Sequence, residues 1–474
     1  MRHKIRMTRF VVLSLLLVLT SFGTGSVQDV SARDRVQIRW FVGLGTGTEA
    51  EQIAAQEAVV SDFNASQDEI ELILEVIPFD QAYDVLATQI AADNAPDIVG
   101  PMGIQGRADF PGVWMDLDPL IQETNYDLSD FDPALLDFYY LEGEGQLGIP
   151  FAVFPSFILY NKDLFDEGDI PYLPSNYNEP YIDWEGNERP WDMSTLREVA
   201  MVLTVDANGN DATMAAFDPD NILQFGFGNW AGPHNDLRAR DTIFGAGSLV
   251  DGEGNAVIPP HWVEAEQWFH QAMWEDFFYP NLIYSQSELL GAGDTNWFGT
   301  GNLGMWHTHM WYMGWGTANL DADWEIAPMP SHNGVVTANL HADTFGIMKS
   351  TDNPEAAFTV LTYLLGEGAN DLTQVYGGMP ARISLQDGYF ERFIEVQQAA
   401  YPDVEWAEKN WHLVTEGLSY PDVPNHQEGL PRSAESRARY ARYAEEFASD
   451  PDFDVEAELE KLRLDLQAIY DTAD

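Results

Sequence analysis

Apolar positions in the first part of the chain follow two patterns in turn, one with the period of a strand and one with the period of a helix. Residues 70–79 (IELILEVIPF) carry an apolar side chain at every second position, which predicts a half-buried strand. Residues 48–63 repeat their apolar side chains at helical spacing, with Thr48 as the expected N-terminal cap. The predicted buried face of this helix consists of Ile53, Val60 and Phe63. Strand signals at 36–44 and 95–100 continue the alternation, which predicts an α/β fold with mainly parallel sheets.

The same patterns return later in the chain. Residues 154–165 (FPSFILYNKDLF) predict a strand that enters a turn, and residues 354–365 predict a helix that starts at Pro354. The last predicted helix, 454–470, has a single apolar stripe made of Val455, Leu459, Leu462, Leu466 and Ile469. A chain of 474 residues has room for about two to three such domains.

The N-terminus has the composition of a secretory signal. Four basic residues precede the short apolar stretch 10–19, and VSA at 30–32 fits a cleavage site, so residues 1–32 are predicted to be a signal peptide. The chain has no cysteine, which excludes disulfides and an anchor through a lipid-modified cysteine. We therefore expect an exported protein, periplasmic or secreted.

The charge balance limits the partners. Lys and Arg total 23 against 77 Asp and Glu, a formal net charge of −54. Such a charge repels nucleic acid and anionic lipid headgroups, and it favours neutral or cationic ligands. Hydrophobic residues make up 45% of the chain, which is enough to fill sizeable cores.

One short run, 296–316 (NWFGTGNLGMWHTHMWYMGWG), concentrates rings and histidines. Three interpretations are open: ordinary core, a metal site, or an aromatic wall against a flat-faced ligand. Trp297, Phe298, Met305 and Met310 fit the core. His307 and His309 would share one face of a strand, but no nearby acidic cluster or cysteine completes a metal shell, so no metal is predicted here.

Several stretches, taken together and in order, resemble the extracellular solute-binding proteins of ABC transporters, the group that includes maltose-binding protein. They are LATQIAADNAPDIV, GIPFAVFPSFILYNKDLF, WFGTGNLGMWHTHMW, WEIAPMPSHNG, FGIMKSTDNPEAAFTVLTYLL and GGMPARISL. The resemblance runs from about residue 36 to 385 and includes a similar terminal helix. It implies a type II periplasmic-binding-protein fold: two α/β lobes, each a mainly parallel sheet with flanking helices, and a ligand cleft between them.

The resemblance also implies a division of the chain. Residues 33–157 would form the first part of lobe 1 and 158–336 the first part of lobe 2. Residues 337–379 would return to lobe 1, and 380–474 would complete lobe 2 with the C-terminal helices. The crossings between lobes are expected near 157–160, 336–339 and 378–382. Closure of the lobes on a ligand would be the signal that a membrane permease reads.

Candidate ligand residues come from both the resemblance and the sequence pattern. Trp311 falls where the family keeps a tryptophan that stacks on a sugar, and Trp306 precedes it. The loop GLGTGTE ends the first strand, where ligands of such sheets bind. The family's cleft-facing Glu is Phe154 here, and the loop after APDIV lacks the residues that grip maltose. The full set is Thr46, Thr48, Glu49, Phe154, Trp230, His234, Trp306, His307, Trp311, His341, Asp343 and Arg382.

One further motif concerns metals. In DANGND (206–211), Asp206, Asn208 and Asn210 are spaced like the start of a calcium loop, but the Gly and Glu of an EF-hand are missing. An Asx-rich turn is the preferred interpretation, with calcium as the alternative, and no cofactor is predicted.

These observations lead to a predicted function. The chain is expected to be a monomeric, non-enzymatic receptor that binds a mono- or oligosaccharide and delivers it to an ABC permease. Two alternatives stay open at this point: a receptor for a cationic ligand such as a polyamine, and an exported glycoside hydrolase, which would need paired carboxylates.

Overall fold

The computed structural model describes residues 35–232, 237–293, 296–313, 316–317, 320–423 and 430–472. The predicted signal peptide, 1–32, and the candidate ligand residue His234 lie outside the described residues. Within them, no helix is long and apolar enough to cross a membrane.

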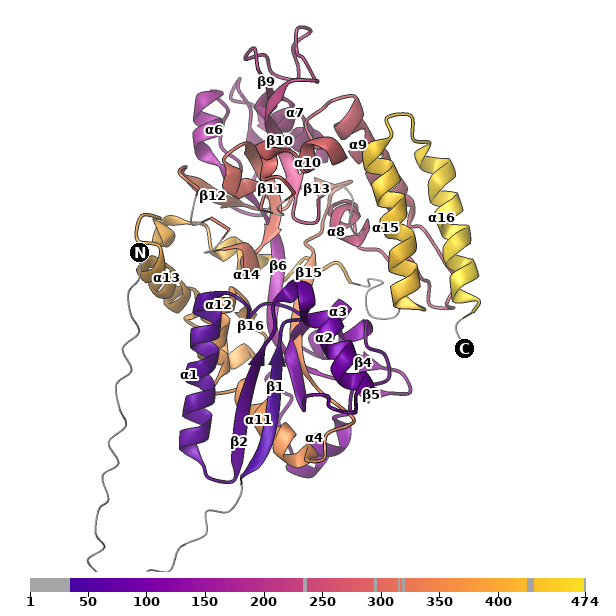
Figure 1. The fold of residues 1–474 in the computed structure, drawn as a ribbon. Helices are drawn as coiled ribbons and strands as arrows, with labels where there is room; N and C mark the ends of the chain where they lie inside the picture. Colours follow the sequence, from indigo (N-terminus) through magenta and orange to yellow (C-terminus); the bar gives the residue numbers. More distant parts are fainter. Residues whose placement is uncertain are drawn as a thin grey trace, which may run out of the picture.

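Two α/β lobes are stacked one above the other, joined by strands that run through the middle (Figure 1). The central sheet has ten strands, and its path is β2-β1-β3-β15-β6-β11-β10-β9, with β12 and β16 also paired to β6. The main strands of each lobe are parallel, as predicted: β1 pairs with β2 and β3, and β10 pairs with β11, whereas the short strand β9 is antiparallel to β10. The strands that pass between lobes, β6 and β15, are antiparallel to their neighbours.

The lower lobe in Figure 1, here the first lobe, is built from two separate parts of the chain. Its elements are β1 (Val36–Val42), α1 (Ala50–Ser66), β2 (Ile70–Val76), α2 (Phe79–Ala91), β3 (Ile98–Gly103), α3 (Ile104–Ala108), α4 (Asp118–Thr124), α5 (Pro133–Asp137), β4 (Tyr140–Leu141), β5 (Gly145–Gln146), β15 (Leu340–Ile347), α11 (Pro354–Leu364), α12 (Ala369–Tyr376), β16 (Met379–Pro380) and α13 (Tyr389–Ala400).

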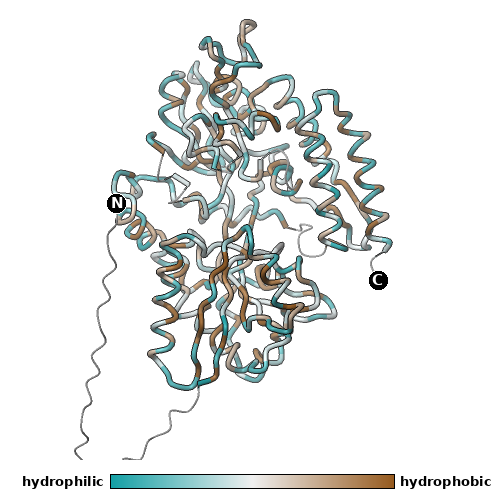
Figure 2. The backbone as a smooth tube through the Cα atoms, viewed as in Figure 1, coloured by the Kyte–Doolittle hydropathy of each residue, from teal (hydrophilic) through white to brown (hydrophobic). Residues whose placement is uncertain are grey.

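The second lobe lies at the other end of β6 (Ile149–Asn161). Its elements are α6 (Lys162–Glu167), β7 (Tyr181–Ile182), β8 (Glu188–Arg189), α7 (Met193–Leu203), β9 (Val205–Asp206), β10 (Ile222–Asn229), α8 (Leu237–Asp241), α9 (Pro260–Trp274), α10 (Leu282–Ser285), β11 (Leu303–His309), β12 (Trp324–Ala327), β13 (Ser331–His332), β14 (Val335–Val336), α14 (His412–Gly417), α15 (Ser433–Ser449) and α16 (Val455–Tyr470). Hydrophobic stretches concentrate in the strands, and hydrophilic ones on the outer helices (Figure 2).

Strand β6 explains how the lobes share one sheet. All thirteen of its residues are buried, because it is covered on both faces. Its first half pairs with β15 and its second half with β11 and β12. The change falls at Pro155–Ser156, a little before the predicted crossing, and the second crossing follows at Asn339, whose carbonyl accepts a hydrogen bond from the Ser156 amide (2.9 Å).

The third crossing lies later in the chain than predicted. Strand β16 pairs with the first-lobe half of β6, and Arg382 bonds Asp130 (3.0 Å) and Tyr126 of the first lobe. Helix α13 then packs on α12, and the chain reaches the second lobe at Trp406, whose ring meets Trp324 at 5.6 Å. Residues 381–400 therefore stay with the first lobe, because the ion pair of Arg382 anchors the segment there.

Two helices show how far periodicity predicts burial. In α16 the buried residues include Val455, Leu459, Leu462 and Leu466 of the predicted stripe. The last buried residue is Tyr470 rather than the predicted Ile469. In α1, Glu49 rather than Thr48 is the N-cap, in a capping box with Gln52. Its buried face is Gln52, Gln56, Val59 and Phe63, because the two glutamine side chains bond the backbone of Gly47 in the preceding loop.

Candidate ligand-binding site

Aromatic side chains gather where the crossing strands meet. In the sheet register His341 of β15 lies opposite Phe154 of β6, and His309 of β11 lies opposite Ser156, two residues further along β6. Residues paired across strands, or two apart on one strand, project from the same face. Phe154, His309 and His341 therefore share a face at the junction of the lobes.

Trp311 and Trp230 complete this group, which we call the aromatic cluster: Phe154, Trp230, His309, Trp311 and His341. The His309 ring stacks on Trp311 (ring centroids 4.0 Å apart, 19° between planes). Trp230 meets Trp311 edge-on at 5.5 Å and His341 at 5.3 Å, and Phe154 meets Trp311 at 5.4 Å. Phe154 and His309 are buried, whereas Trp230, Trp311 and His341 are partly exposed.

The bonding of His309 fixes which ring nitrogen carries its proton. Nδ1 lies 2.9 Å from the carbonyl oxygen of Phe154, which can only accept, so Nδ1–H is the donor. Burial, then the nearby His341 and His307, holds the pKa of His309 well below its ordinary value, so the ring is neutral near pH 7. Its Nε2 is therefore a lone-pair acceptor, buried and without a hydrogen-bond partner in the described part of the chain.

His307 has the opposite arrangement. The Asn229 amide nitrogen donates to Ala239 O (2.7 Å) and also lies 3.2 Å from Nδ1 of His307, so that Nδ1 accepts. Burial lowers the pKa of His307 to about 3, so this ring too is neutral and carries its proton on Nε2. That N–H is buried and has no partner among the described residues. Its ring lies 6.0 Å from His309, on the same face of β11, as predicted.

Trp230 offers a second unused donor. Its backbone N–H bonds the carbonyl of His307 (3.0 Å), which extends β10 alongside β11 and brings the indole into the aromatic cluster. The indole Nε1–H is buried and lacks an acceptor within the described residues. The cluster and His307 therefore present two unused donors and one unused acceptor beside the faces of aromatic rings.

Trp306 lies elsewhere. It projects from the opposite face of β11, is fully buried, stacks on Phe298 (ring centroids 6.0 Å apart, 7° between planes) and also contacts the Tyr312 ring (4.4 Å). Trp297, Phe298, Met305 and Met310 are buried as well, as expected of core residues.

The remaining candidates are spread over the first lobe. Asp343 is two residues beyond His341 on β15, and burial raises its pKa to about 7. Thr46 and Thr48 are partly exposed in the β1–α1 loop, and Glu49 is exposed. Glu49 lines a separate pocket at the start of α1 rather than the aromatic cluster. Arg382 is held in the first lobe by Asp130 and Tyr126.

The candidate calcium loop forms a hydrogen-bonded turn. Although burial acts to raise the pKa of Asp206, hydrogen bonds from Asn210, Asp218 and Asn208 lower it below its ordinary range. The carboxylate accepts from Asn208 N (2.8 Å), Asn210 N (2.9 Å), Asn210 Nδ2 (3.0 Å) and Asp218 N (2.9 Å). These donors occupy the lone pairs that a cation would use, which is the pattern of an Asx turn. Among the described residues no group of three or more His, Cys, Asp or Glu could hold a metal.

Two functional features escaped the sequence analysis. His309 was left out of the predicted ligand residues, yet it stands at the centre of the cluster, and its alternation with His307 before Trp311 was the available signal. Behind it, the buried Arg238 makes a two-pronged ion pair with Asp422 (2.8 and 2.9 Å). Asp422 also accepts from the amide of Leu340 (2.8 Å), which fixes the start of β15 and so the position of His341.

The family of the chain follows from a match over most of its length. The family model described as bacterial extracellular solute-binding protein matches residues 46–371. The chain belongs to this family. No curated protein matches the sequence. This solute-binding protein shares its fold with many solved structures, and the predicted two-lobe fold is confirmed.

Three of these structures illustrate the likeness. An ABC substrate-binding protein from Listeria monocytogenes in complex with cycloalternan is 19% identical (TM-score 0.68; 92% of this chain and 99% of that chain covered). A maltose-bound MalE3 from T. maritima is 17% identical (TM-score 0.63; 91% and 99%). UgpB from Mycobacterium tuberculosis, in complex with glycerophosphocholine, is 16% identical (TM-score 0.67; 93% and 99%). At these identities the likeness establishes the fold of the solute-binding protein alone.

Proposed function

We propose that this solute-binding protein binds a carbohydrate, a mono- or oligosaccharide, between its lobes and delivers it to an ABC permease without chemical change. The observation that carries the proposal is the aromatic cluster together with the unpartnered polar atoms His309 Nε2, His307 Nε2 and Trp230 Nε1. Indole faces can cover the apolar C–H face of a sugar ring, and such contacts contribute on the order of 1 kcal/mol beyond area burial.

The hydrogen-bonding set of the site fits hydroxyl groups. A hydroxyl both donates and accepts, so it can use the acceptor His309 Nε2 and also the donors on His307 and Trp230. Because both histidines are neutral near pH 7, the cluster does not depend on a charged ligand. Two of the structural neighbours are described with cycloalternan and maltose, in keeping with this proposal.

The carboxyl groups argue for binding rather than hydrolysis. Glycoside hydrolases place two carboxyl groups on either side of the bond that breaks. Among the described residues on the cluster face of β15 and β6, Asp343 is the single carboxyl group, and burial raises its pKa to about 7, so protonated and ionised forms coexist in neutral solution. We therefore propose a receptor rather than a hydrolase. We further propose that it acts as a monomer in the extracytoplasmic space, after removal of the signal peptide.

The test begins with a thermal-shift screen of mono- and oligosaccharides, followed by calorimetry on the sugar that stabilises the protein most. Replacing Trp311 by Ala removes an aromatic ring that would contact the sugar, so we expect a loss of about 2 kcal/mol in binding, which raises the dissociation constant more than tenfold. Partial exposure of Trp311 predicts a small change in melting temperature. A stabilising sugar whose affinity is the same for Trp311→Ala and wild type would exclude the cluster as its site.

A further inference from the structure

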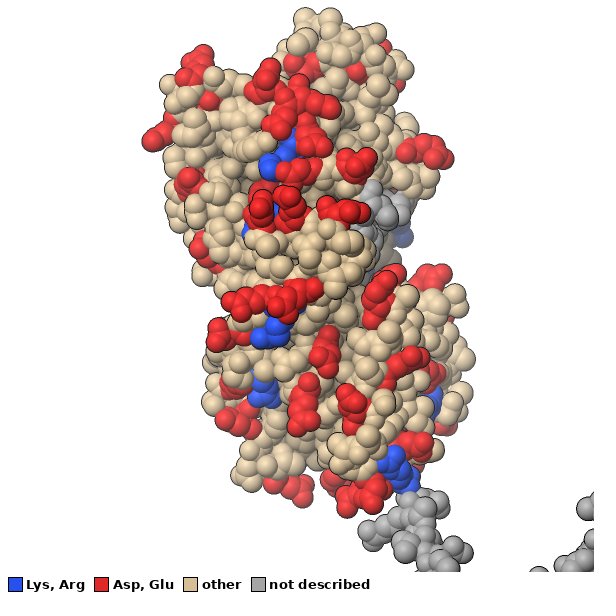
Figure 3. All heavy atoms as spheres, turned by 90° about the vertical axis from the view of Figure 1, so that its left-hand side faces the viewer, with Lys and Arg blue, Asp and Glu red and all other residues tan. Residues whose placement is uncertain are grey.

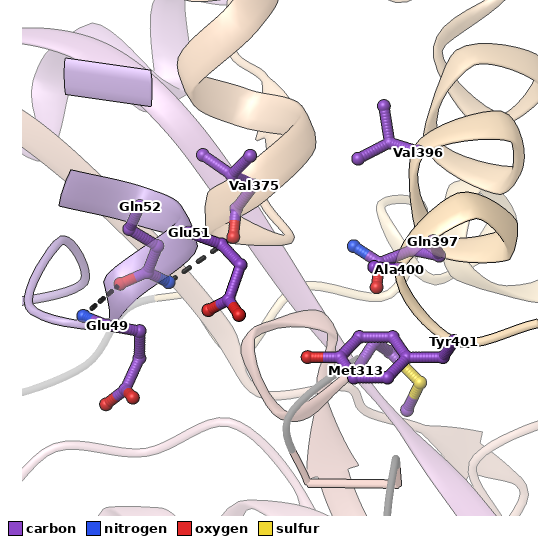
Figure 4. A pocket seen from close by; sticks show the side chains of 9 residues that line it. All are labelled: Glu49, Glu51, Gln52, Met313, Val375, Val396, Gln397, Ala400 and Tyr401. Carbon is purple, nitrogen blue, oxygen red and sulfur yellow. Dashed lines mark hydrogen bonds between the residues drawn. The ribbon is translucent and has the colours of Figure 1, made fainter. Parts of the chain in front are cut away.

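A pocket lies on the seam between the lobes, at the N-terminal end of α1 (Figure 4). Met313, which follows β11 and the short turn Met310–Tyr312, comes from the second lobe. The other walls come from the first lobe, and the volume is about 450 Å³ including the open mouth. The lining residues are Glu49, Glu51, Gln52, Met313, Val375, Val396, Gln397, Ala400 and Tyr401.

The polar atoms facing this pocket are mainly acceptors. Glu51 extends its carboxylate towards the Tyr401 hydroxyl in Figure 4. The Gln397 side chain is 6% exposed and its amide points into the space between Val375 and Tyr401. Its Nε2 donates to Gln374 O (3.5 Å), whereas its Oε1 is buried with no hydrogen-bond partner in the described part of the chain. Gln52 is committed to Gly47 N, Glu49 N and Val375 O and is not available.

A buried, unused carbonyl oxygen requires a donor, because an unsatisfied polar atom in a dry environment is costly. The two carboxylates at the mouth add negative charge, and none of the lining residues is Lys or Arg to neutralise them. The donor that fits is therefore a cation. The Tyr401 ring supplies a face of the kind over which ammonium and guanidinium groups bind, and Met313 adds an adaptable apolar wall beside it.

The surroundings strengthen the attraction. Figure 3 shows the face of the molecule that carries α1 and α13, where acidic groups far outnumber basic ones. The whole chain has a formal net charge of −54. A field of one sign raises the local concentration of the opposite ion around a concave site.

We propose that this pocket binds the ammonium or guanidinium end of an organic amine, at a site separate from the aromatic cluster. The cation would donate to Gln397 Oε1 and to Glu51, and its carbon stem would lie against Val396 and Met313. Because Met313 belongs to the second lobe, the amine would contact both lobes, so binding would favour the arrangement in which they touch.

Calorimetry with putrescine and n-butylamine, at low ionic strength and in the absence of sugar, tests the proposal. Both amines should bind, and n-butanol, which has the same stem without the charge, should not. Glu51→Gln should weaken amine binding about tenfold, because it removes a charge-assisted hydrogen bond. Glu57→Gln is the matched control: Glu57 is exposed on the same helix, does not line the pocket, and its loss should leave the affinity unchanged.

Three outcomes would overturn the proposal. Absence of amine binding is the first. Equal loss of affinity in Glu51→Gln and Glu57→Gln is the second, because it would mean diffuse attraction to an acidic surface. The third is loss of amine binding in Trp311→Ala, which would place the amine in the aromatic cluster. The proposal does not depend on sugar binding, since a protein that bound no sugar could still bind amines through Glu51.

Discussion

The tautomers of two histidines decide what the aromatic cluster can recognise. His309 donates to a backbone carbonyl and His307 accepts from an asparagine amide, so their free nitrogens have opposite roles although both rings are neutral. Residue type alone does not determine this difference, because it depends on partners far away in the sequence. The pair therefore offers one acceptor and one donor on the same face of β11.

Trp306 provides the clearest contrast with Trp311, five residues away. Because it is fully buried between Phe298 and Tyr312, we expect Trp306→Leu to lower the free energy of unfolding by about 3 kcal/mol. Its ring is outside the aromatic cluster, so sugar affinity per folded molecule should not change. Chemical denaturation and calorimetry on the same preparation measure both quantities. A large loss of affinity with unchanged stability would instead place Trp306 in the ligand site.

Asp343 should make stability depend on pH. Burial raises its pKa in the folded protein to about 7, whereas the unfolded chain releases this proton near its ordinary value of 3.8. Between about pH 4 and about pH 7 the folded state keeps a proton that the unfolded state loses, so the free energy of unfolding falls as pH rises, by about 1.4 kcal/mol per pH unit. Below about pH 4 Asp343 is protonated in both the folded and the unfolded states, so the free energy of unfolding no longer depends on this group.

The isosteric substitution Asp343→Asn isolates this effect from the many surface carboxylates. Denaturation of both proteins from about pH 5 to about pH 7 should show the variant gaining stability relative to wild type as pH rises, since it has no proton to release. Parallel pH profiles for the two proteins would mean that Asp343 is ionised throughout and that burial does not raise its pKa.

At the scale of elements, periodicity predicted the first strands and helices, the central strand β6 and the helices α11 and α16, but not the partners of these elements. The alternation of strands and helices and the apolar stripe of α16 follow from local hydrophobic spacing, which the sequence displays directly. The buried glutamines of α1 do not, because their burial depends on hydrogen bonds to Gly47 that spacing cannot reveal. The third crossing was misplaced for a similar reason: Arg382 is held by Asp130, about 250 residues away in sequence.

The candidate site was predicted in part, by resemblance and ring content. Phe154, Trp230, Trp311 and His341 do come together in the structure. His309 was underestimated because its role comes from long-range packing of β6 against β11. Arg238 and Asp422, which fix the start of β15, share no local motif that could have revealed them.

The second crossing should depend strongly on that buried ion pair. Arg238 and Asp422 both have side chains that are 0% exposed, and Asp422 also accepts from Asn339 Nδ2 (2.8 Å). We expect Asp422→Asn to lower the free energy of unfolding by about 3–5 kcal/mol, because it leaves Arg238 charged and buried without its counter-ion. Urea denaturation measures the loss.

A surface pair serves as the control for this prediction. Arg463 and Glu460 form an ion pair three residues apart on α16, with side chains 32% and 57% exposed. Glu460→Gln should leave the unfolding midpoint almost unchanged, because exposed ion pairs contribute little. Equal effects of the two substitutions would mean that burial does not distinguish them and that Asp422 is not essential to the crossing.

At the scale of the whole molecule, the lobes touch on both sides of the crossing strands. On one side, Gly377 at the end of α12 lies against the second lobe so closely that a Cβ there would be 2.5 Å from the carbonyl oxygen of Met310. On the other side, α15 packs with α16 and α9 of the second lobe and reaches down to the first lobe (Figure 1). There Arg437 forms an ion pair with Asp109, which follows α3. Helix α15 thus bridges the two lobes.

Closure should therefore depend on Arg437. The ion pair is partly buried, with side chains 20% and 13% exposed, and it exists only while α15 lies against the first lobe. Removing it with Arg437→Gln should shift the population towards open forms, because an interaction present in one state only sets the balance between them. Small-angle scattering of the ligand-free variant should give a larger radius of gyration than wild type. The sugar affinity should fall by about the same factor as the fraction of closed molecules.

The control is Arg442→Gln, which removes the same charge from an exposed position on the same helix and should change neither measurement. If both variants scatter like wild type and bind sugar equally well, the ion pair is a passive surface contact and closure is governed by the ligand and the crossing strands alone.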